Sequence, residues 1–183
     1  DVVARARLYL DNVKGGLGAY SDSKGNPYVR KVVAQFIQER DGVPSNPDHI
    51  FLTNGASEAI RMVLNAVIRG PGDGIMVPIP QYPLYSASVV LYNGTLVPYY
   101  LDEDNTWAMN ISELERSIED ARTKGINVRA LVFINPGNPT GQCLSAENLQ
   151  DLLRFCHRHN LLVLADEVYQ ENVYVPGRDF VSA

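Results

Sequence analysis

Short apolar runs alternate along the chain with segments in which apolar residues recur every three or four positions. The runs predict strands at Ile50–Thr53, Gly74–Pro78, Thr95–Tyr100, Val128–Ile134 and Leu161–Asp166. Helical periods lie before and between these runs, so strands and helices alternate along the chain. This alternation predicts an α/β fold, with three layers in the order α/β/α around a mostly parallel sheet.

Most of the predicted helices begin at a residue that can cap them. Asn26 followed by Pro27 favours a helix start, and Ser112 with Glu115 forms a capping box. Ser145 precedes a further helix, and Gly125 suits the end of the helix that Ser112 begins. The apolar stripes of the predicted helices are Val29, Val32, Val33, Phe36 and Ile37; Ile60, Val63, Leu64 and Val67; Leu114, Ile118 and Ala121; and Leu149, Leu152, Leu153 and Cys156.

Length and composition fit one core domain of a globular protein. We expect residues 1–25 to form an N-terminal helix and loop segment, and residues 26–183 to form the larger domain. The net charge of −5 argues against nucleic acid or an anionic membrane as the main partner. No apolar run approaches the ~18 residues of a membrane span. Cys143 and Cys156 are too few for a disulfide framework or a zinc site.

Polar residues that could carry chemistry directly follow the predicted strands. Ligands of parallel sheets bind outside the carboxyl ends of the strands, and there the chain places Asn138, Asp166 and Tyr169. A carboxylate at the end of a buried strand needs a cation opposite it. An amide, a carboxylate and a phenol at strand ends fit a pyridinium cofactor. Asp166 would then face the protonated nitrogen, and Asn138 and Tyr169 the phenolate oxygen.

Each of these residues also has a purely structural interpretation. Asp166 could cap a helix, and Asn138 could belong to a plain turn. Two Asn-Pro steps within Asn135–Gly141 favour a sharp loop, and Asn138-Pro139 is our candidate for a cis peptide bond. Glu167 is the lesser candidate because it should point away from Asp166.

Two further segments complete the candidate site. The turn Gly55-Ala56-Ser57 opens a helix, where unpaired N–H groups and small residues can receive a phosphate. The alternative is an ordinary capped turn. Prolines stiffen the loop around Tyr82, whose ring could stack on a heteroaromatic ring. The alternative for Tyr82 is a core or interface tyrosine, the interpretation that we favour for Tyr85.

The stretches "PIPQYPLYSA", "FINPGNPTGQ" and "LADEVYQENVY" resemble those of the class I aminotransferases, pyridoxal 5'-phosphate (PLP) enzymes of fold type I. Among these, the chain is most similar to those that act on alanine. The resemblance spans essentially the whole chain and implies the PLP-binding large domain. It implies amino-group transfer between L-alanine and 2-oxoglutarate, giving pyruvate and L-glutamate. It also implies an intracellular homodimer, cytoplasmic or mitochondrial, with no nucleic acid or membrane partner.

The resemblance assigns roles residue by residue. It matches Gly55, Ala56 and Ser57 to the phosphate-binding turn, Tyr82 to the ring-stacking aromatic residue, Asn138 and Tyr169 to the partners of the phenolate oxygen, and Asp166 to the partner of the pyridine nitrogen. It also matches Gly18-Ala19-Tyr20, with Gly25, to a segment whose tyrosine reaches the phosphate of the neighbouring subunit. We expect no metal site.

The family's Schiff-base lysine has no counterpart among Lys14, Lys24, Lys31 and Lys124. In the family it lies on a later strand, whereas Lys24 lies on a predicted loop. We therefore expect the chain to be a fragment, most of the cofactor-binding half of an enzyme, and to be inactive alone.

Two other functions stay open. One is a class I aminotransferase with an aromatic or glutamine-like donor, and the other is a PLP-binding module without catalysis. A nucleotide-binding α/β domain is disfavoured, because Asp166 would repel phosphate and the chain has no suitable glycine fingerprint.

Overall fold

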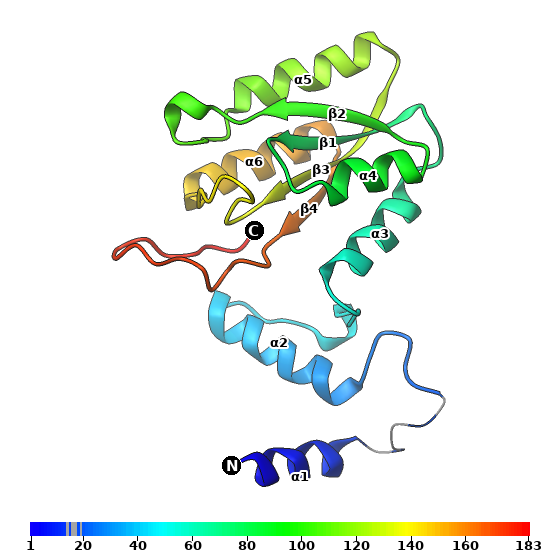
Figure 1. The fold of residues 1–183 in the computed structure, drawn as a ribbon, viewed down its shortest axis with the longest axis vertical. Helices are drawn as coiled ribbons and strands as arrows, with labels where there is room; N and C mark the ends of the chain where they lie inside the picture. The colour runs from blue at the N-terminus through cyan, green and yellow to red at the C-terminus, as the bar shows by residue number, and fades with distance from the viewer. Residues whose placement is uncertain (14, 16–17, 19) are drawn as a thin grey trace. The chain divides into compact units, whose positions relative to one another are not determined.

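A computed structural model describes residues 1–13, 15, 18 and 20–183, which form two compact units, Asp1–Asn54 and Gly55–Ala183 (Figure 1). The first unit holds helices α1 (Val2–Asn12) and α2 (Pro27–Asp41) and the short 3-10 helix η1 (Pro47–His49). The boundary that we expected between residues 25 and 26 stays a prediction.

The second unit is built on a four-stranded sheet in which every pairing is parallel. Its strands are β1 (Asp73–Ile79), β2 (Thr95–Tyr100), β3 (Asn127–Ile134) and β4 (Leu162–Asp166), in the spatial order β2-β1-β3-β4. Four of the five predicted strands are therefore confirmed. All four point their carboxyl ends to the same edge of the sheet, which is where ligands of parallel sheets bind.

The predicted strand at Ile50–Thr53 is wrong. This stretch belongs to no strand among the described residues, and its Leu52 N–H instead donates to the Lys24 carbonyl at 2.8 Å. An apolar run forms a strand only when a partner strand is available for its backbone groups. Here the run is held by the loop before α2.

Helices cover both faces of the sheet, as the three-layer prediction required. On one face, α5 (Ile111–Thr123) and α6 (Ala146–His159) bury leucines and Phe155 against alternate residues of the strands, such as Met76 and Leu131. On the other face, α3 (Ala56–Val67) and α4 (Leu84–Leu91) pack against Ile75 and Val132. Because strand side chains alternate, each strand contributes to both cores.

The helix ends show which sequence signals were informative. Asn26 and Ser145 cap α2 and α6 as predicted, each with its side chain accepting from a first-turn N–H. The capping box at Ser112 is wrong, because Asn110 caps α5 two residues earlier and accepts from the Ser112 N–H at 3.0 Å. Gly125, with φ of 73°, lies just beyond the end of α5. Helix α4 was not predicted, since its sequence LYSASVVL is too uniformly apolar to show a helical stripe.

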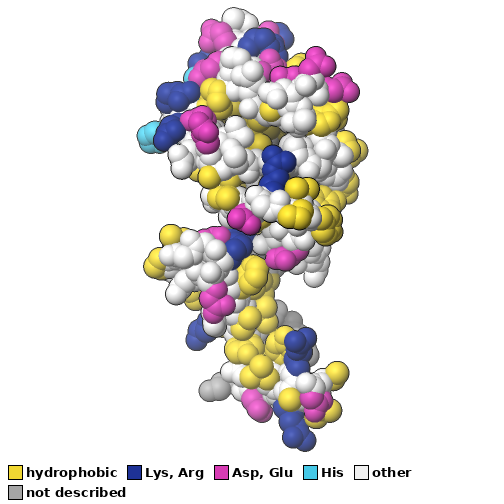
Figure 2. Space-filling view, turned by 90° about the vertical axis from the view of Figure 1, so that its left-hand side faces the viewer, with side chains coloured by type: hydrophobic (Ala, Val, Ile, Leu, Met, Phe, Trp, Pro, Cys, Tyr) yellow, Lys and Arg dark blue, Asp and Glu magenta, His cyan; other side chains and the backbone are white. Residues whose placement is uncertain are grey.

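Acidic and basic side chains are interspersed on the face shown in Figure 2. No broad basic patch lies on that face. Helices of the described residues are too short or too polar to span a bilayer.

Candidate functional site

A cavity of about 230 Å³ lies at the carboxyl edge of the sheet, within the second unit. It is lined by residues from the start of α3, the loop after β1, the loop after β3 and the turn after β4. The lining residues are Ala56, Ser57, Ile60, Tyr82, Leu84, Ile134, Asn138, Asp166, Val168 and Tyr169. Six of these were predicted as site residues, and they span 113 positions of the sequence, from Ala56 to Tyr169.

The start of α3 forms one wall of this cavity. Gly55, with φ of 87°, is the N-cap residue of α3 and has no side chain with which to cap the helix. A residue with a Cβ would be strained at this positive φ, which explains the glycine. The N-terminus of α3 therefore presents its partial positive charge, through the small residues Ala56 and Ser57, to whatever occupies the cavity.

The loop between β3 and α6 brings Asn138 to Tyr169. The Asn138 Nδ2 donates to the Tyr169 hydroxyl at 3.3 Å, so the amide and the phenol form a pair. The Asn138-Pro139 bond is cis, as predicted, and Ile79-Pro80 and Asn135-Pro136 are cis as well. Backbone bonds from Gly137 to Gln142 and from Gly141 to Gly137 close the loop. Asn138 and Tyr169 thus approach one point in the cavity from two loops.

Asn135 has a different function from Asn138, although both precede a proline. Its side chain is fully buried, and its Oδ1 accepts from the Leu144 N–H at 2.9 Å. Its Nδ2 donates to the Val181 carbonyl at 3.4 Å, and its own N–H donates to the Asp166 carbonyl at 2.9 Å. Asn135 therefore braces the end of β4, and sequence reasoning gave it no such role.

Asp166 ends β4 with both carboxylate oxygens engaged. Its Oδ1 accepts from the Val168 N–H at 3.3 Å, and its Oδ2 accepts from the Tyr85 hydroxyl. The helix-cap alternative is wrong, because the described chain after Asp166 makes turns and no helix begins there. Glu167 turns to the C-terminal segment instead, where it accepts from Ser182 and from the Ala183 N–H.

Tyr85 lies under Asp166 and has only 1% of its surface exposed, which confirms that it is a core tyrosine. Burial, followed by the hydrogen bond to Asp166 and the charge of that carboxylate, raises the pKa of Tyr85 far above its ordinary value. The phenol is therefore a permanent donor to Asp166. This contact was missed, because α4 also holds Ser86 and Ser88 and its sequence does not single out the Tyr85 hydroxyl.

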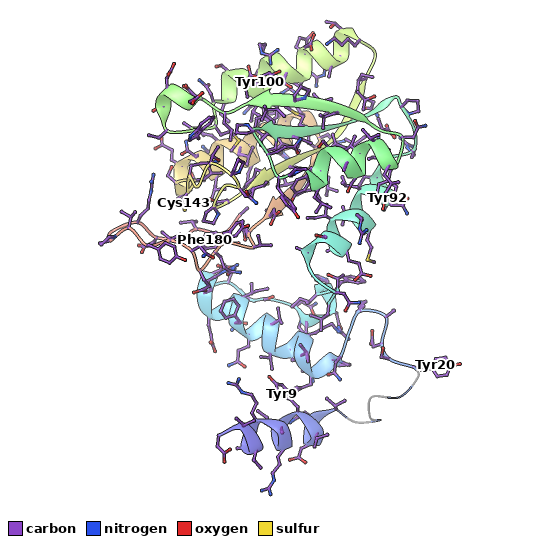
Figure 3. All side chains as sticks on the ribbon, viewed as in Figure 1. Tyr9, Tyr20, Tyr92, Tyr100, Cys143 and Phe180 are labelled. Atoms are coloured by element: carbon purple, nitrogen blue, oxygen red, sulfur yellow. The ribbon has the colours of Figure 1, made fainter. Side chains whose placement is uncertain are left out.

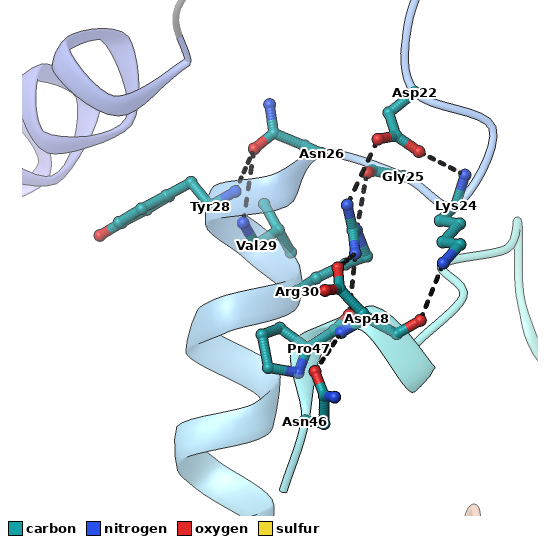
Figure 4. A network of polar contacts seen from close by, with 10 residues as sticks. All are labelled: Asp22, Lys24, Gly25, Asn26, Tyr28, Val29, Arg30, Asn46, Pro47 and Asp48. Carbon is teal, nitrogen blue, oxygen red and sulfur yellow. Dashed lines mark hydrogen bonds and ion pairs between the residues drawn. The ribbon is translucent and has the colours of Figure 1, made fainter.

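Tyr20 belongs to the first unit, and 97% of its surface is exposed (Figure 3). Ala19, its predicted companion, lies outside the described residues. The segment after Tyr20 is anchored by Arg30, whose guanidinium binds the Gly25 carbonyl at 3.1 Å and the Pro47 carbonyl at 2.8 Å (Figure 4). Arg30 also pairs with Asp22 at 3.3 Å and Asp48 at 3.2 Å. The exposed phenol of Tyr20 thus precedes a loop that is held in place by Arg30.

The described lysines are engaged elsewhere or point to solvent. The Lys24 Nζ donates to the Asp48 carbonyl at 2.9 Å, on the loop where it was predicted. Lys124 pairs with Asp120 at 2.7 Å, Lys31 is exposed on α2, and Lys14 lies outside the described residues. Across the part of the chain that the structure describes, no group of three acidic, histidine or cysteine side chains could hold a metal ion.

Comparison with known proteins gives consistent matches. The family described as aminotransferase class I and II matches residues 2–183. Glutamate–glyoxylate aminotransferase 1 of Arabidopsis thaliana is 59% identical over the whole chain, which covers 38% of that protein. The mitochondrial alanine aminotransferase 1 of the same plant is 55% identical, again over the whole chain and 34% of its own length. The chain thus spans little more than a third of these relatives.

Among solved structures, the alanine aminotransferase of Pyrococcus furiosus superposes with a TM-score of 0.81. It is 30% identical, over 97% of this chain and 43% of that one. An aminotransferase of Escherichia coli superposes with a TM-score of 0.82 at 31% identity, over 99% of this chain and 42% of that one.

Proposed function

The chain belongs to the class I and II aminotransferases, and from this premise we propose that its protein transfers an amino group from L-alanine to 2-oxoglutarate with the help of PLP. The products would be pyruvate and L-glutamate. The observation that carries the proposal is the meeting of Asp166, the Asn138–Tyr169 pair and the start of α3 around one cavity.

The donors and acceptors of this cavity fit the groups of PLP. The Asp166 carboxylate suits a protonated pyridine nitrogen, and the Asn138–Tyr169 pair can donate to a phenolate oxygen. The N–H groups at Ala56 and Ser57 suit the phosphate. Tyr82, which is 44% exposed, can offer its ring face to a flat ligand. The pyridine nitrogen, the phenolate oxygen and the phosphate of the cofactor therefore each have a complementary partner in this cavity.

These residues would divide the work of the reaction. When bound, PLP supplies a ring that takes up the electrons released at the substrate α-carbon. The Asp166 carboxylate holds the proton on the ring nitrogen, which keeps the ring electron-poor. Asn138 and Tyr169 fix the ring in the plane that Tyr82 covers, and the start of α3 anchors its phosphate. We place the lysine that carries the cofactor outside these 183 residues.

A second candidate function is transfer from L-glutamate to glyoxylate. It is favoured by the 59% identical relative, whose name states that pair of substrates. The residues that line the cavity are those that we assign to the cofactor, so they do not decide between the two amino donors. The alternatives of an aromatic or glutamine-like donor, or of PLP binding without catalysis, also remain as outcomes of the test.

The test uses the natural protein that contains this sequence, purified with PLP. We expect L-alanine with 2-oxoglutarate to give a kcat/KM at least about tenfold above that of aromatic donors or glutamine, a discrimination of ~1.4 kcal/mol. A higher kcat/KM for glutamate with glyoxylate would select the second candidate. PLP binding without turnover of any pair would contradict both and support a module without catalysis.

We also propose a homodimer in which Tyr20 binds the phosphate of the partner's cofactor. The support is a fully exposed phenol on an anchored segment. We propose an intracellular site, either the cytoplasm or the mitochondrion; the mitochondrial names of two relatives support the second.

A further inference from the structure

The contact between Tyr85 and Asp166 joins two elements that are distant in sequence. Tyr85 lies in the first turn of α4, and its ring is buried in the core between α3, α4 and the sheet, among Leu64, Val77 and Ile134. Asp166 ends β4, 81 positions further along the chain. The hydroxyl of Tyr85 is thus the polar tip of an otherwise apolar side chain, and the tip is directed at the carboxylate.

The surroundings leave the other side of Asp166 open. A second cavity, of about 520 Å³, is lined by both Tyr85 and Asp166, whereas the first cavity is lined by Asp166 without Tyr85. The carboxylate therefore stands between a buried phenol and the space in which the ring nitrogen would lie. A phenylalanine would fill the same apolar space, so packing alone does not require the hydroxyl.

We propose that Tyr85 is a positioning residue, whose hydroxyl fixes the Asp166 carboxylate in the orientation that binds the pyridine nitrogen of the cofactor. The proposal rests on the proposed function, since it assigns to Asp166 the nitrogen as its partner. Only two donors of the described residues bind the carboxylate, Tyr85 and the Val168 N–H at 3.3 Å. Without the hydroxyl, the carboxylate would be held on one oxygen and could rotate.

The test compares Tyr85→Phe with Tyr99→Phe in the holoenzyme of the natural protein that contains this sequence. Tyr99 is the matched control: it is equally buried, at 1% exposure, and its hydroxyl donates to the Val132 carbonyl at 2.8 Å in the opposite core. Both changes delete one buried hydroxyl, but only one of those hydroxyls contacts Asp166. A loss of stability alone would therefore affect both variants.

The main readout is the ¹⁵N resonance of labelled PLP at its pyridine nitrogen, which reports the proton on that atom directly. We expect Tyr85→Phe to move this resonance toward the unprotonated value and to lower kcat about tenfold. Losses of this size are common when a residue that orients a binding side chain by a hydrogen bond is removed. The KM for the amino donor should change less than twofold, because Tyr85 does not reach the first cavity. Tyr99→Phe should leave the resonance and kcat as in the wild type.

A second comparison separates this proposal from the proposed function. In the Asp166→Asn background, Tyr85→Phe should lower kcat no further, because the two residues act as one unit. A nitrogen resonance unchanged by Asp166→Asn would overturn the assignment of Asp166 itself. A resonance moved by Asp166→Asn but unmoved by Tyr85→Phe would overturn the positioning function alone. Should Tyr85→Phe not fold, Tyr85→Met fills the space with a flexible apolar side chain. A moved nitrogen resonance in Tyr85→Met would then support the positioning function, and an unmoved one would overturn it.

Discussion

Replacing Asp166 by asparagine should damage the chemistry far more than the fold. The change removes the negative charge but keeps the volume of the side chain and an acceptor for the Tyr85 hydroxyl. Two opposite charges ~4 Å apart near a protein surface attract by about 4 kcal/mol. A loss of ~2.7 kcal/mol of this in the transition state already lowers kcat about 100-fold. We expect a fall of about 100- to 1,000-fold, the range found for single preorganised electrostatic partners.

The matched control is Asp73→Asn, the same change at the opposite edge of the sheet. Asp73 opens β1, has 7% of its surface exposed, and accepts from the Arg69 N–H at 3.0 Å. That hydrogen bond, followed by the charges of Arg129 and Arg69, outweighs burial and holds the pKa of Asp73 below its usual range. We expect Asp73→Asn to lower the free energy of unfolding by about 1–3 kcal/mol while kcat stays near the wild-type value.

The assay follows pyruvate formation from saturating L-alanine and 2-oxoglutarate, and urea unfolding is measured on the same preparations. Asp166→Asn should reduce kcat and change the free energy of unfolding by less than about 1 kcal/mol. The reasoning is refuted if Asp166→Asn keeps a normal kcat and loses only stability. Asp166 would then only stabilise the end of β4, as Asp73 stabilises the start of β1.

Four further outcomes are expected. The isolated 183-residue chain with excess PLP should not convert alanine and 2-oxoglutarate; turnover that disappears in Lys24→Ala would contradict our placement of the lysine outside the chain. Gly74→Ala should lower the free energy of unfolding in urea by about 1–3 kcal/mol, because its Cβ would meet Ile126 and Val97 at 2.6 and 2.8 Å. Gly72→Ala, with open space around its Cβ, should not. Burial acts to raise the pKa of Glu115 on α5, but hydrogen bonds from Arg158 and His159 of α6 lower it overall, so the stability that Glu115 contributes is present above about pH 4.3 and is lost as the pH falls through the lowered folded pKa. The difference in unfolding midpoint between wild type and Glu115→Gln should therefore shrink from pH 7 to ~3. A constant difference would be evidence that these contacts between α5 and α6 do not stabilise the fold. Hybrid dimers would combine Tyr20→Phe subunits with subunits that lack the Schiff-base lysine. The site with the intact lysine then receives Tyr20 from its partner subunit and should bind PLP as tightly as wild type. A weakening equal to that of the Tyr20→Phe homodimer would place Tyr20 in its own subunit's site.

The parts of the fold that could be predicted from sequence are those fixed by local chemistry. Buried parallel strands appear as apolar runs such as Val128–Ile134, and Asn26-Pro27 is a helix start that needs no tertiary contact. Ile50–Thr53 has the same composition but finds no partner strand among the described residues, and a sequence does not state which runs will pair. The cap at Asn110 was missed because Ser112 offered an equally good local signal two residues later.

The candidate site divides in the same way. Asn138, Asp166 and Tyr169 could be predicted because each lies at or just beyond the carboxyl end of a strand, and parallel strands share one carboxyl edge. Asn135 and Tyr85 could not be assigned, because their partners Leu144 and Asp166 are fixed by packing rather than by position along a strand. A tyrosine in an apolar helix becomes a hydrogen-bond donor to a site only when the helix has docked.

The register between β3 and β4 restricts the ways in which this sequence can change in length. Ile134 pairs with Asp166 and Phe133 with Ala165, so Asp166 and Leu164 share the face that Tyr85 occupies. Inserting or deleting one residue within β4 would exchange its two faces and direct Ala165 or Glu167 at Tyr85. Changes of length are therefore tolerable in the loops before β4, while within the strand only an even number preserves the side on which the carboxylate emerges. In an alignment of homologues, gaps should be absent from Leu162–Asp166 and concentrated in the connections around it.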